Sequence, residues 1–393
     1  MKKMLSLAAM FAVLSYASPA SAVELKFGGD AAVRVRDTSN DAAHQSSDDF
    51  YSQYRLRLNG SADLGDGYII KVQLTNEAPN YVPKNAPSGA PAGTVALGGG
   101  GGWQTVGYGN SELYTLGASQ IYFGRFYGDS HYLVGRLPLN STNNPIFDLT
   151  LYPKNPLDVP TTTFQNDRLF GANWGTKIGD GDLNLVVGTF DNISANDTGG
   201  TGDGVLNDGY AFVASYKATI GNVTVEPEVI TAITKFDSVT QQTFSASNAG
   251  YGAPFHQGIR PVTFGANVGV PVGDLKLGFS GLYNIGKGTT PSSSIYAYAN
   301  QNVDYTGYLL RIKAEYGKFL AWYDYNKTTD NSSAIISHEY TNQFVWAQYQ
   351  IPVGKITIQP TLRYLTTSDH VGGTVADANT SRLRSELWAS LAF

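Results

Sequence analysis

The chain has 393 residues, of which 42% are hydrophobic and 15% are charged, with 44 Gly, 25 Tyr and no Cys. Without cysteine, disulfide frameworks and Cys-ligated metal or haem sites are excluded. A net charge of −5, with Lys and Arg scattered rather than clustered, argues against a nucleic-acid surface. After the first 22 residues no apolar run approaches the roughly 20 residues that a membrane-spanning helix needs. This composition is typical of a large β protein.

The N-terminus has the three parts of a secretory signal peptide. Residues 2–3 are both Lys, residues 4–14 form an apolar core, and Ala-Ser-Ala at residues 20–22 is a small-residue cleavage site. The apolar core is too short for a membrane anchor, so we expect residues 1–22 to be cleaved and residues 23–393 to form one exported domain. The alternative is a buried N-terminal helix of a cytosolic protein, which would not require these three parts in this order.

Beyond the signal, apolar and polar residues alternate with a period of two in segments of about ten residues. Tyr-Arg-Leu-Arg-Leu at residues 54–58 is an example. The pattern predicts sixteen strands, at residues 26–37, 51–63, 68–79, 114–126, 131–138, 168–178, 183–191, 209–220, 223–235, 259–272, 275–287, 303–316, 319–328, 341–353, 355–367 and 381–393.

The connections between these strands are alternately short and long. Seven are tight and rich in Gly, Asp and Asn, which supply the positive φ of hairpin turns. They lie at residues 64–67, 127–130, 179–182, 220–222, 272–274, 316–318 and 353–355. Eight are long and polar, at residues 37–49, 80–112, 139–167, 192–208, 237–258, 288–302, 329–340 and 368–380.

This alternation favours a membrane barrel over a soluble sandwich, in which both ends would carry loops of mixed length. A transmembrane β-barrel has an even strand number, short periplasmic turns and long extracellular loops. Lipid cannot satisfy a free strand edge, so the last strand has to pair with the first. The sequence therefore predicts an all-β fold, a transmembrane antiparallel up-and-down β-barrel of sixteen strands.

The parity of each strand predicts which face meets lipid. In the last strand the apolar residues from Leu383 to Phe393 share one parity, whereas Arg382, Arg384 and Glu386 share the other. The apolar parity should face lipid and the polar parity the lumen.

The end of the chain carries a more specific resemblance. Phe393 is preceded at alternate positions by Leu391, Ala389 and Leu387. This pattern resembles the C-terminal signal of bacterial outer-membrane barrel proteins, which the barrel assembly machinery reads during biogenesis.

A second segment is similar to the Gly-rich strand pair before the third loop of general porins. It comprises Ser-Gln-Ile-Tyr-Phe-Gly at residues 119–124 and, after a turn, Leu-Val-Gly-Arg at residues 133–136. With the signal peptide, strand number and loop order, the whole chain resembles the sixteen-stranded Gram-negative outer-membrane porin family. The third loop departs from the family pattern, since residues 144–148 read Asn-Pro-Ile-Phe-Asp rather than a Pro-Glu-Phe-Gly-type motif.

The predicted inward parities place nine cations in the lumen. They are Arg34, Arg36, Arg55, Arg57, Lys71, Arg136, Arg363, Arg382 and Arg384. Closure makes the first three and last two strands neighbours, so most of these cations would line one wall. The alternative is a solvated face or structural pairing with Glu77, Glu226, Glu228 and Glu386.

The resemblance implies further features of the loops. In the family the third loop folds into the lumen, which would set Asp148, Asp158 and Asp167 opposite the basic wall. The second loop of trimeric porins reaches a neighbouring subunit, so the resemblance implies a homotrimer. The alternative for this loop is a flexible surface segment, because residues 98–102 are five consecutive glycines.

No enzyme or cofactor site is indicated. The five His show no metal-ligand spacing, and no Gly-x-Ser-x-Gly nucleophile motif occurs. Three functions remain open for a barrel in the outer membrane of a Gram-negative bacterium: a diffusion channel for small hydrophilic solutes and ions, a channel selective for phosphate or carboxylate anions, and a structural barrel that sheaths a partner such as a cytochrome.

Overall fold

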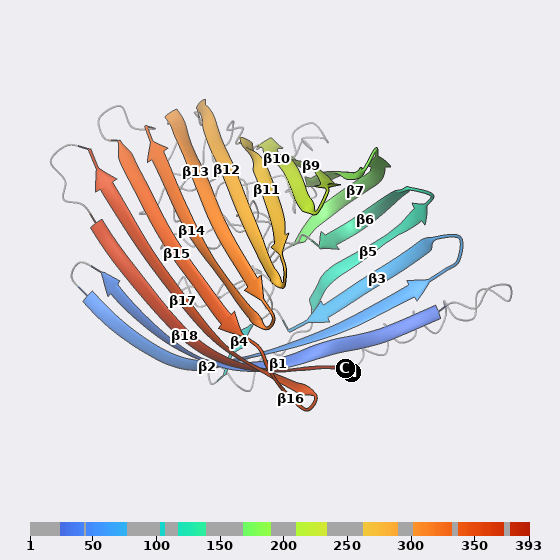
Figure 1. Cartoon of the computed structure of the whole chain (residues 1–393), viewed down its shortest axis with the longest axis horizontal. Helices are drawn as coiled ribbons and strands as arrows, with labels where there is room; N and C mark the ends of the chain where they lie inside the picture. Colours follow the sequence, from blue (N-terminus) through green and yellow to red (C-terminus); the bar gives the residue numbers. More distant parts are fainter. Residues whose placement is uncertain are drawn as a thin grey trace, which may run out of the picture.

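A computed structural model describes residues 24–42, 45–76, 103–106, 117–138, 168–189, 210–233, 262–289, 302–331, 337–372 and 378–393. The signal peptide predicted for residues 1–22 lies outside these ranges. Almost every described residue is in a β-strand (Figure 1). Among the described residues no helix is both long and apolar enough to cross a membrane.

The strands are β1 (Glu24–Ala42), β2 (Gln45–Asp63), β3 (Tyr68–Thr75), β4 (Gln104–Thr105), β5 (Gly117–Tyr127), β6 (Ser130–Pro138), β7 (Arg168–Ile178), β8 (Gly181–Thr189), β9 (Tyr210–Ile220), β10 (Val223–Ile233), β11 (Val262–Val272), β12 (Leu275–Thr289), β13 (Asn302–Tyr316), β14 (Phe319–Asp330), β15 (His338–Tyr349), β16 (Ile351–Val353), β17 (Ile356–Val371) and β18 (Ala378–Ala392).

Sixteen of these strands form one closed antiparallel barrel. β16 continues β15 along β17, and the two-residue β4 lies against β2. Each remaining strand pairs with its neighbour in the chain, and β18 returns to pair with β1 from Asp30↔Ala392 to Ala42↔Thr380. The predicted sixteen-stranded up-and-down barrel is confirmed. β4 is an addition that the alternation pattern did not predict.

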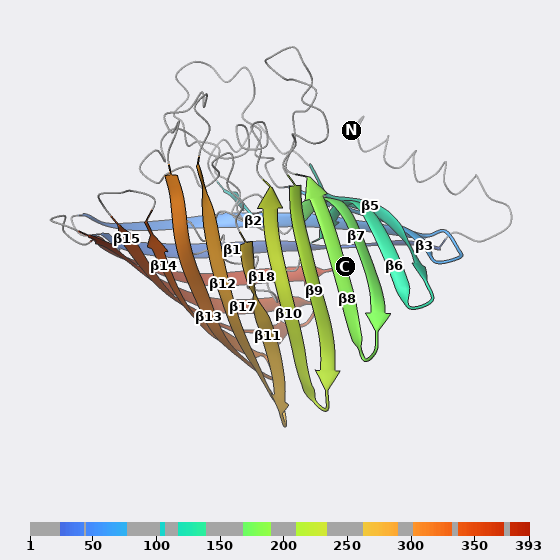
Figure 2. The same cartoon turned by 90° about the horizontal axis from the view of Figure 1, so that it is seen from above.

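Tight turns lie at one end of the barrel, which we call the turn end. Figure 2 shows the turns of β7–β8, β9–β10 and β11–β12 gathered along one edge. Each of the seven predicted turns contains a Gly whose φ lies between 55° and 84°. Gly adopts this left-handed conformation without a steric penalty, so the glycines in the sequence predict where the turns lie.

The chain terminus lies in the seam between β1 and β18. The backbone N–H of Gly29 donates to Phe393 O at 2.8 Å, and Phe393 N–H donates back to Gly29 O at 3.0 Å. A Cβ atom at Gly29 would come within 2.8 Å of the Phe393 ring and 2.4 Å of Arg57 O. Glycine is therefore required here by close approach, and the terminal Phe packs over it.

The two faces of the wall differ in composition. Outward side chains are mostly apolar and exposed, as in Leu387 and Tyr364, whereas inward Asp324 and Asn326 are buried. The inward rows also contain apolar residues that the pattern did not predict. Leu282 pairs with Leu309 across β12 and β13, and both are buried. Such inward apolar pairs pack against each other and interrupt the polar lining.

Candidate pore wall

Seven arginines from four adjacent strands line one side of the lumen. We call this set the basic wall: Arg55 and Arg57 of β2, Arg34 and Arg36 of β1, Arg382 and Arg384 of β18, and Arg363 of β17. Antiparallel partners point to the same face of a sheet, so the register groups these side chains. Arg36 pairs with Glu386, Ala32 with Arg55, and Arg363 with Arg384.

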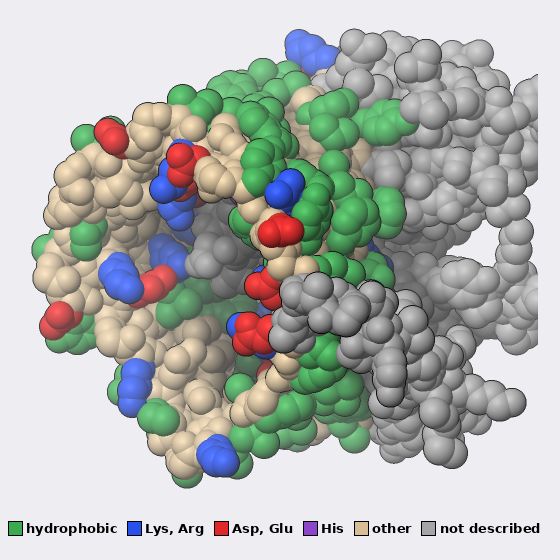
Figure 3. Space-filling model, turned by 90° about the vertical axis from the view of Figure 1, so that its right-hand side faces the viewer, with side chains coloured by type: hydrophobic (Ala, Val, Ile, Leu, Met, Phe, Trp, Pro, Cys, Tyr) green, Lys and Arg blue, Asp and Glu red, His purple; other side chains and the backbone are tan. Residues whose placement is uncertain are grey.

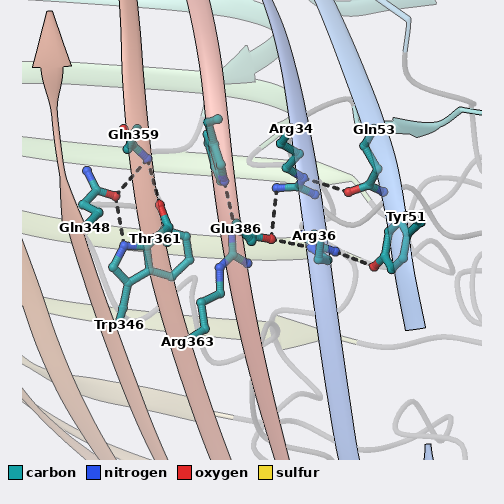
Figure 4. A network of polar contacts seen from close by, with 11 residues as sticks. Arg34, Arg36, Tyr51, Gln53, Trp346, Gln348, Gln359, Thr361, Arg363 and Glu386 are labelled. Atoms are coloured by element: carbon teal, nitrogen blue, oxygen red, sulfur yellow. Dashed lines mark hydrogen bonds and ion pairs between the residues drawn. The ribbon is translucent and has the colours of Figure 1, made fainter. Parts of the chain in front are cut away.

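Glu386 is the centre of the basic wall. Its carboxylate accepts a hydrogen bond from Arg36 Nε, lies 2.8 Å from Arg363 Nη2 and lies 3.7 Å from Arg34 Nη1 (Figure 4). Trp388 Nε1 donates a hydrogen bond to Glu386 Oε2, the oxygen that also contacts Arg363, at 3.0 Å. The Glu386 side chain has no exposed surface. One carboxylate from β18 thus holds guanidiniums from β1 and β17, the strands on either side.

Neutral side chains complete the positioning of the two β1 arginines. Arg34 Nε donates to Gln53 Oε1 at 2.7 Å, and Arg36 Nη1 donates to the Tyr51 hydroxyl at 2.9 Å, both on β2 (Figure 4). Arg34 and Arg36 are each only 6% exposed. Their guanidiniums are therefore fixed against the wall rather than free in the lumen.

A second carboxylate, Asp30 of β1, holds the two β2 arginines. Arg55 Nη2 lies 2.9 Å from Asp30 Oδ2, and Arg57 Nε lies 2.5 Å from Asp30 Oδ1. Arg382 makes no ion pair with any described residue, and the cations that act on it electrostatically are Arg384, Arg36 and Arg363. Five of the seven guanidiniums thus contact one of two carboxylates, Asp30 or Glu386, so cations outnumber acids in the basic wall among the described residues.

Tryptophan rings lie between the arginines. Arg34 Cζ is 4.1 Å from the Trp103 ring centroid and 5.1 Å from that of Trp388. Arg363 Cζ is 3.8 Å from the Trp346 ring centroid. A guanidinium stacked on an indole is stabilised by cation–π attraction and keeps its N–H edges for hydrogen bonding.

The strand pattern did not predict these tryptophans in the lumen, for two different reasons. Trp388 and Trp346 share the inward parity of Glu386 and Arg363, so strand parity alone would have found them. Trp103 lies in the predicted second loop, where no strand pattern indicates a direction.

Lys71 and Arg136 lie apart from the basic wall. Lys71 is inward by register, opposite Ser61 and Tyr122, but it lies near the turn end of β3 and is exposed. The prediction that Arg136 faces the lumen is wrong. Its register partners are the outward, exposed Ile121 and Phe170, so Arg136 also faces outward. Its Nη1 donates to a backbone carbonyl, Ala118 O, at 3.3 Å.

The wrong direction for Arg136 has a simple cause. Residues 130–137 do not alternate cleanly, since Tyr132 and Val134 occupy one parity and Leu133 and Leu137 the other. Only the charge of Arg136 favoured the lumen, and charge alone does not determine which face a side chain occupies.

The wall opposite β1 carries acids. Eight strand-to-strand steps separate β10 from β1 in either direction around the barrel. Glu226 and Glu228 of β10 have inward parity, and Glu228 accepts a hydrogen bond from Asn267 Nδ2 at 3.0 Å. Asp148, Asp158 and Asp167, predicted to face the basic wall from the third loop, lie outside the described residues, as does Glu77.

Figure 3 shows one end of the molecule in a space-filling view. Charged side chains surround a hollow, and hydrophobic side chains cover much of the adjoining outer surface.

Leu387, Leu391 and Phe393, predicted to form an assembly signal with Ala389, share the outward parity of β18. Within the described part of the chain no group of His, Asp and Glu has the arrangement of a metal site.

A closed antiparallel barrel with an apolar outward face and a charged inward face is the architecture of a transmembrane β-barrel. The structure is similar to that of the anion-selective porin from Comamonas acidovorans, with a TM-score of 0.53, 14% identity, and 94% of this chain and 100% of that chain covered. It is also similar to OmpT, an outer membrane protein of Vibrio cholerae, in its trimer form, with a TM-score of 0.52, 9% identity, and 94% and 100% of the two chains covered. The chain therefore has the sixteen-stranded barrel fold of the outer-membrane porins. No protein-family model and no curated protein sequence matches it.

Proposed function

We propose that this protein is an outer-membrane porin, a water-filled channel through which small hydrophilic solutes and ions diffuse passively, with a preference for anions. The observation that carries the proposal is the basic wall inside a closed barrel. Seven guanidiniums lie there with two carboxylates, which contact five of them, so passing anions are attracted. The anion-selective porin from Comamonas acidovorans, whose fold is similar, supports the same direction.

We also propose where the channel resides and how it assembles. The protein is exported through its signal peptide, residues 1–22, folds into the outer membrane of a Gram-negative bacterium with the help of the barrel assembly machinery, and is not an enzyme. A homotrimer is proposed because the V. cholerae OmpT, whose fold is similar, is described in a trimer form. In this proposal the third loop folds into the lumen and its acids Asp148, Asp158 and Asp167 face the basic wall.

A second candidate is a channel selective for phosphate or carboxylate solutes. Arg382 favours it, because this inward guanidinium makes no ion pair with the described residues. A planar guanidinium binds an oxyanion through two parallel hydrogen bonds, so Arg382 is suited to hold a solute briefly during passage.

Planar-bilayer recording of the purified protein separates these functions. A diffusion channel gives a large ohmic conductance in KCl, with a reversal potential in a salt gradient that indicates anion preference. A selective channel gives a current that saturates with phosphate or with one carboxylate. Absence of conductance would contradict both and favour a barrel that sheaths a partner.

A further inference from the structure

A segment of the predicted second loop returns to the barrel wall. β4 pairs with β2 through Gln53↔Thr105 and Tyr54↔Gln104, and Val106 N–H donates to Ser52 O at 2.8 Å. This place on β2 lies beyond the end of β3, whose last ladder residue, Thr75, pairs with Arg57. The second loop therefore extends the wall where β3 stops.

The register of β4 directs Trp103 into the lumen. Thr105 lies opposite Gln53, an inward residue that binds Arg34. Trp103 precedes Thr105 by two residues and shares its parity. The indole is only 6% exposed, so it is packed inside the barrel rather than displayed on a loop.

Trp103 lies between two arginines of the basic wall. The Cζ atoms of Arg34 and Arg55 are 4.1 Å and 4.8 Å from its ring centroid. The Trp388 ring meets it edge-on, at a centroid distance of 5.0 Å and an interplanar angle of 68°. One indole from a loop segment thus contacts side chains of β1, β2 and β18.

These contacts join a longer row of stacked rings and cations. Beyond Trp388, Arg363 covers Trp346, which stacks on Trp322 at 4.7 Å with an interplanar angle of 10°. Trp388, Trp346 and Trp322 belong to barrel strands. Trp103 is the one member of this row, within the described residues, that is supplied from outside the sixteen strands.

A ring in this place separates like charges and limits their motion. Without it, Arg34 and Arg55 would gain rotamer freedom and the lumen would gain the volume of an indole. Because selectivity depends on the distance between the permeating ion and the fixed charge, both changes alter conduction.

We propose that Trp103 is a positioning residue of the pore, through which the second loop holds Arg34 and Arg55 against the wall and thereby sets its width and its anion preference. The inference rests on the proposed channel function for its effect on conduction, but the positioning of the two arginines is independent of it.

The first test measures positioning directly. In folded protein, modification of Arg34 and Arg55 by phenylglyoxal is followed by peptide mass spectrometry. In Trp103→Ala we expect both to react about threefold faster or more, in line with the loss of a cation–π contact. In Trp103→Phe, which keeps an aromatic face, the rates should stay near those of the wild type. The matched control is Trp174→Ala on the outward face of β7. Unchanged rates in Trp103→Ala would overturn the inference, whether or not the protein conducts.

The second test measures the consequence in planar bilayers. Trp103→Ala should conduct more than wild type and show a weaker anion preference in a KCl gradient, with Trp103→Phe close to wild type. Faster modification together with unchanged conductance and reversal potential would overturn the role in selectivity. A wild-type protein without conductance would contradict the proposed function instead, and the modification rates would still decide the positioning role.

Discussion

The basic wall and the wall around β10 face each other across the lumen and are built differently. On the basic wall, large guanidiniums lie in contact with indoles and with two shared carboxylates. Around β10, the inward residues are mostly small or neutral, such as Thr263 and Asn267, and the acids Glu226 and Glu228 lie among them.

This difference shows how a barrel of low overall charge can carry a strong local field. Only 15% of the chain is charged, but the outward half of each strand must be nearly free of charge, so the remainder is concentrated on the inward face. Cations gathered on one side attract anions even though the net charge of the chain is −5.

The largest expected effect comes from removing the centre of the basic wall. Glu386→Gln leaves Arg34, Arg36 and Arg363 without their shared carboxylate. Breaking a buried ion pair from one side typically costs about 3–5 kcal/mol, so we expect a loss of at least about 3 kcal/mol. The loss should appear as a lower free energy of unfolding in urea titrations in detergent, followed by tryptophan fluorescence.

The matched control for Glu386→Gln is on the facing wall. Glu226 of β10 is half-buried and makes no ion pair with the described residues, so Glu226→Gln should change the unfolding free energy by less than about 1 kcal/mol. Equal losses in the two variants would mean that Glu386 is not a structural centre.

Removing a carboxylate from the wall around β10 should have a smaller effect, which is on ion selectivity. Glu228→Gln keeps an oxygen to accept the hydrogen bond from Asn267 but removes a negative charge. The reversal potential in a KCl gradient should shift further toward anion selectivity. Glu315→Gln, close to the turn end and paired with Lys313 at 2.7 Å, serves as the control. An unchanged reversal potential in Glu228→Gln would show that this carboxylate does not act on the permeating ions.

The smallest effect is expected for Arg136. Its side chain lies on the outward face, so Arg136→Ser should leave the reversal potential unchanged. Bilayer recordings under the same salt gradient provide the check. If the anion preference fell as much as in a basic-wall variant, the outward placement of Arg136 would be wrong.

Most of the fold was predictable because its determinants are local. A period of two marks a strand, and a Gly with positive φ marks a tight turn, so β7 coincides with the predicted strand at residues 168–178. Closure followed from the cost of a free edge in lipid. None of these inferences depends on distant contacts.

The site was less predictable because its geometry is not local. Parity placed Arg34 and Arg384 inward, but it did not indicate that Glu386 would contact three guanidiniums from two neighbouring strands. The position of Trp103 depends on the pairing of β4, a segment of the predicted second loop, with β2. No periodicity in the sequence predicts that pairing. Arg136 was misplaced because β6 alternates poorly.

The central claim is that the basic wall makes the pore prefer anions. The most direct measurement is the reversal potential in a KCl gradient for the wild type and for the double variant Arg55→Ser, Arg384→Ser. We expect an anion-selective wild type and a double variant that loses a large part of this preference. Cation selectivity in the wild type, unchanged in the double variant, would contradict the claim.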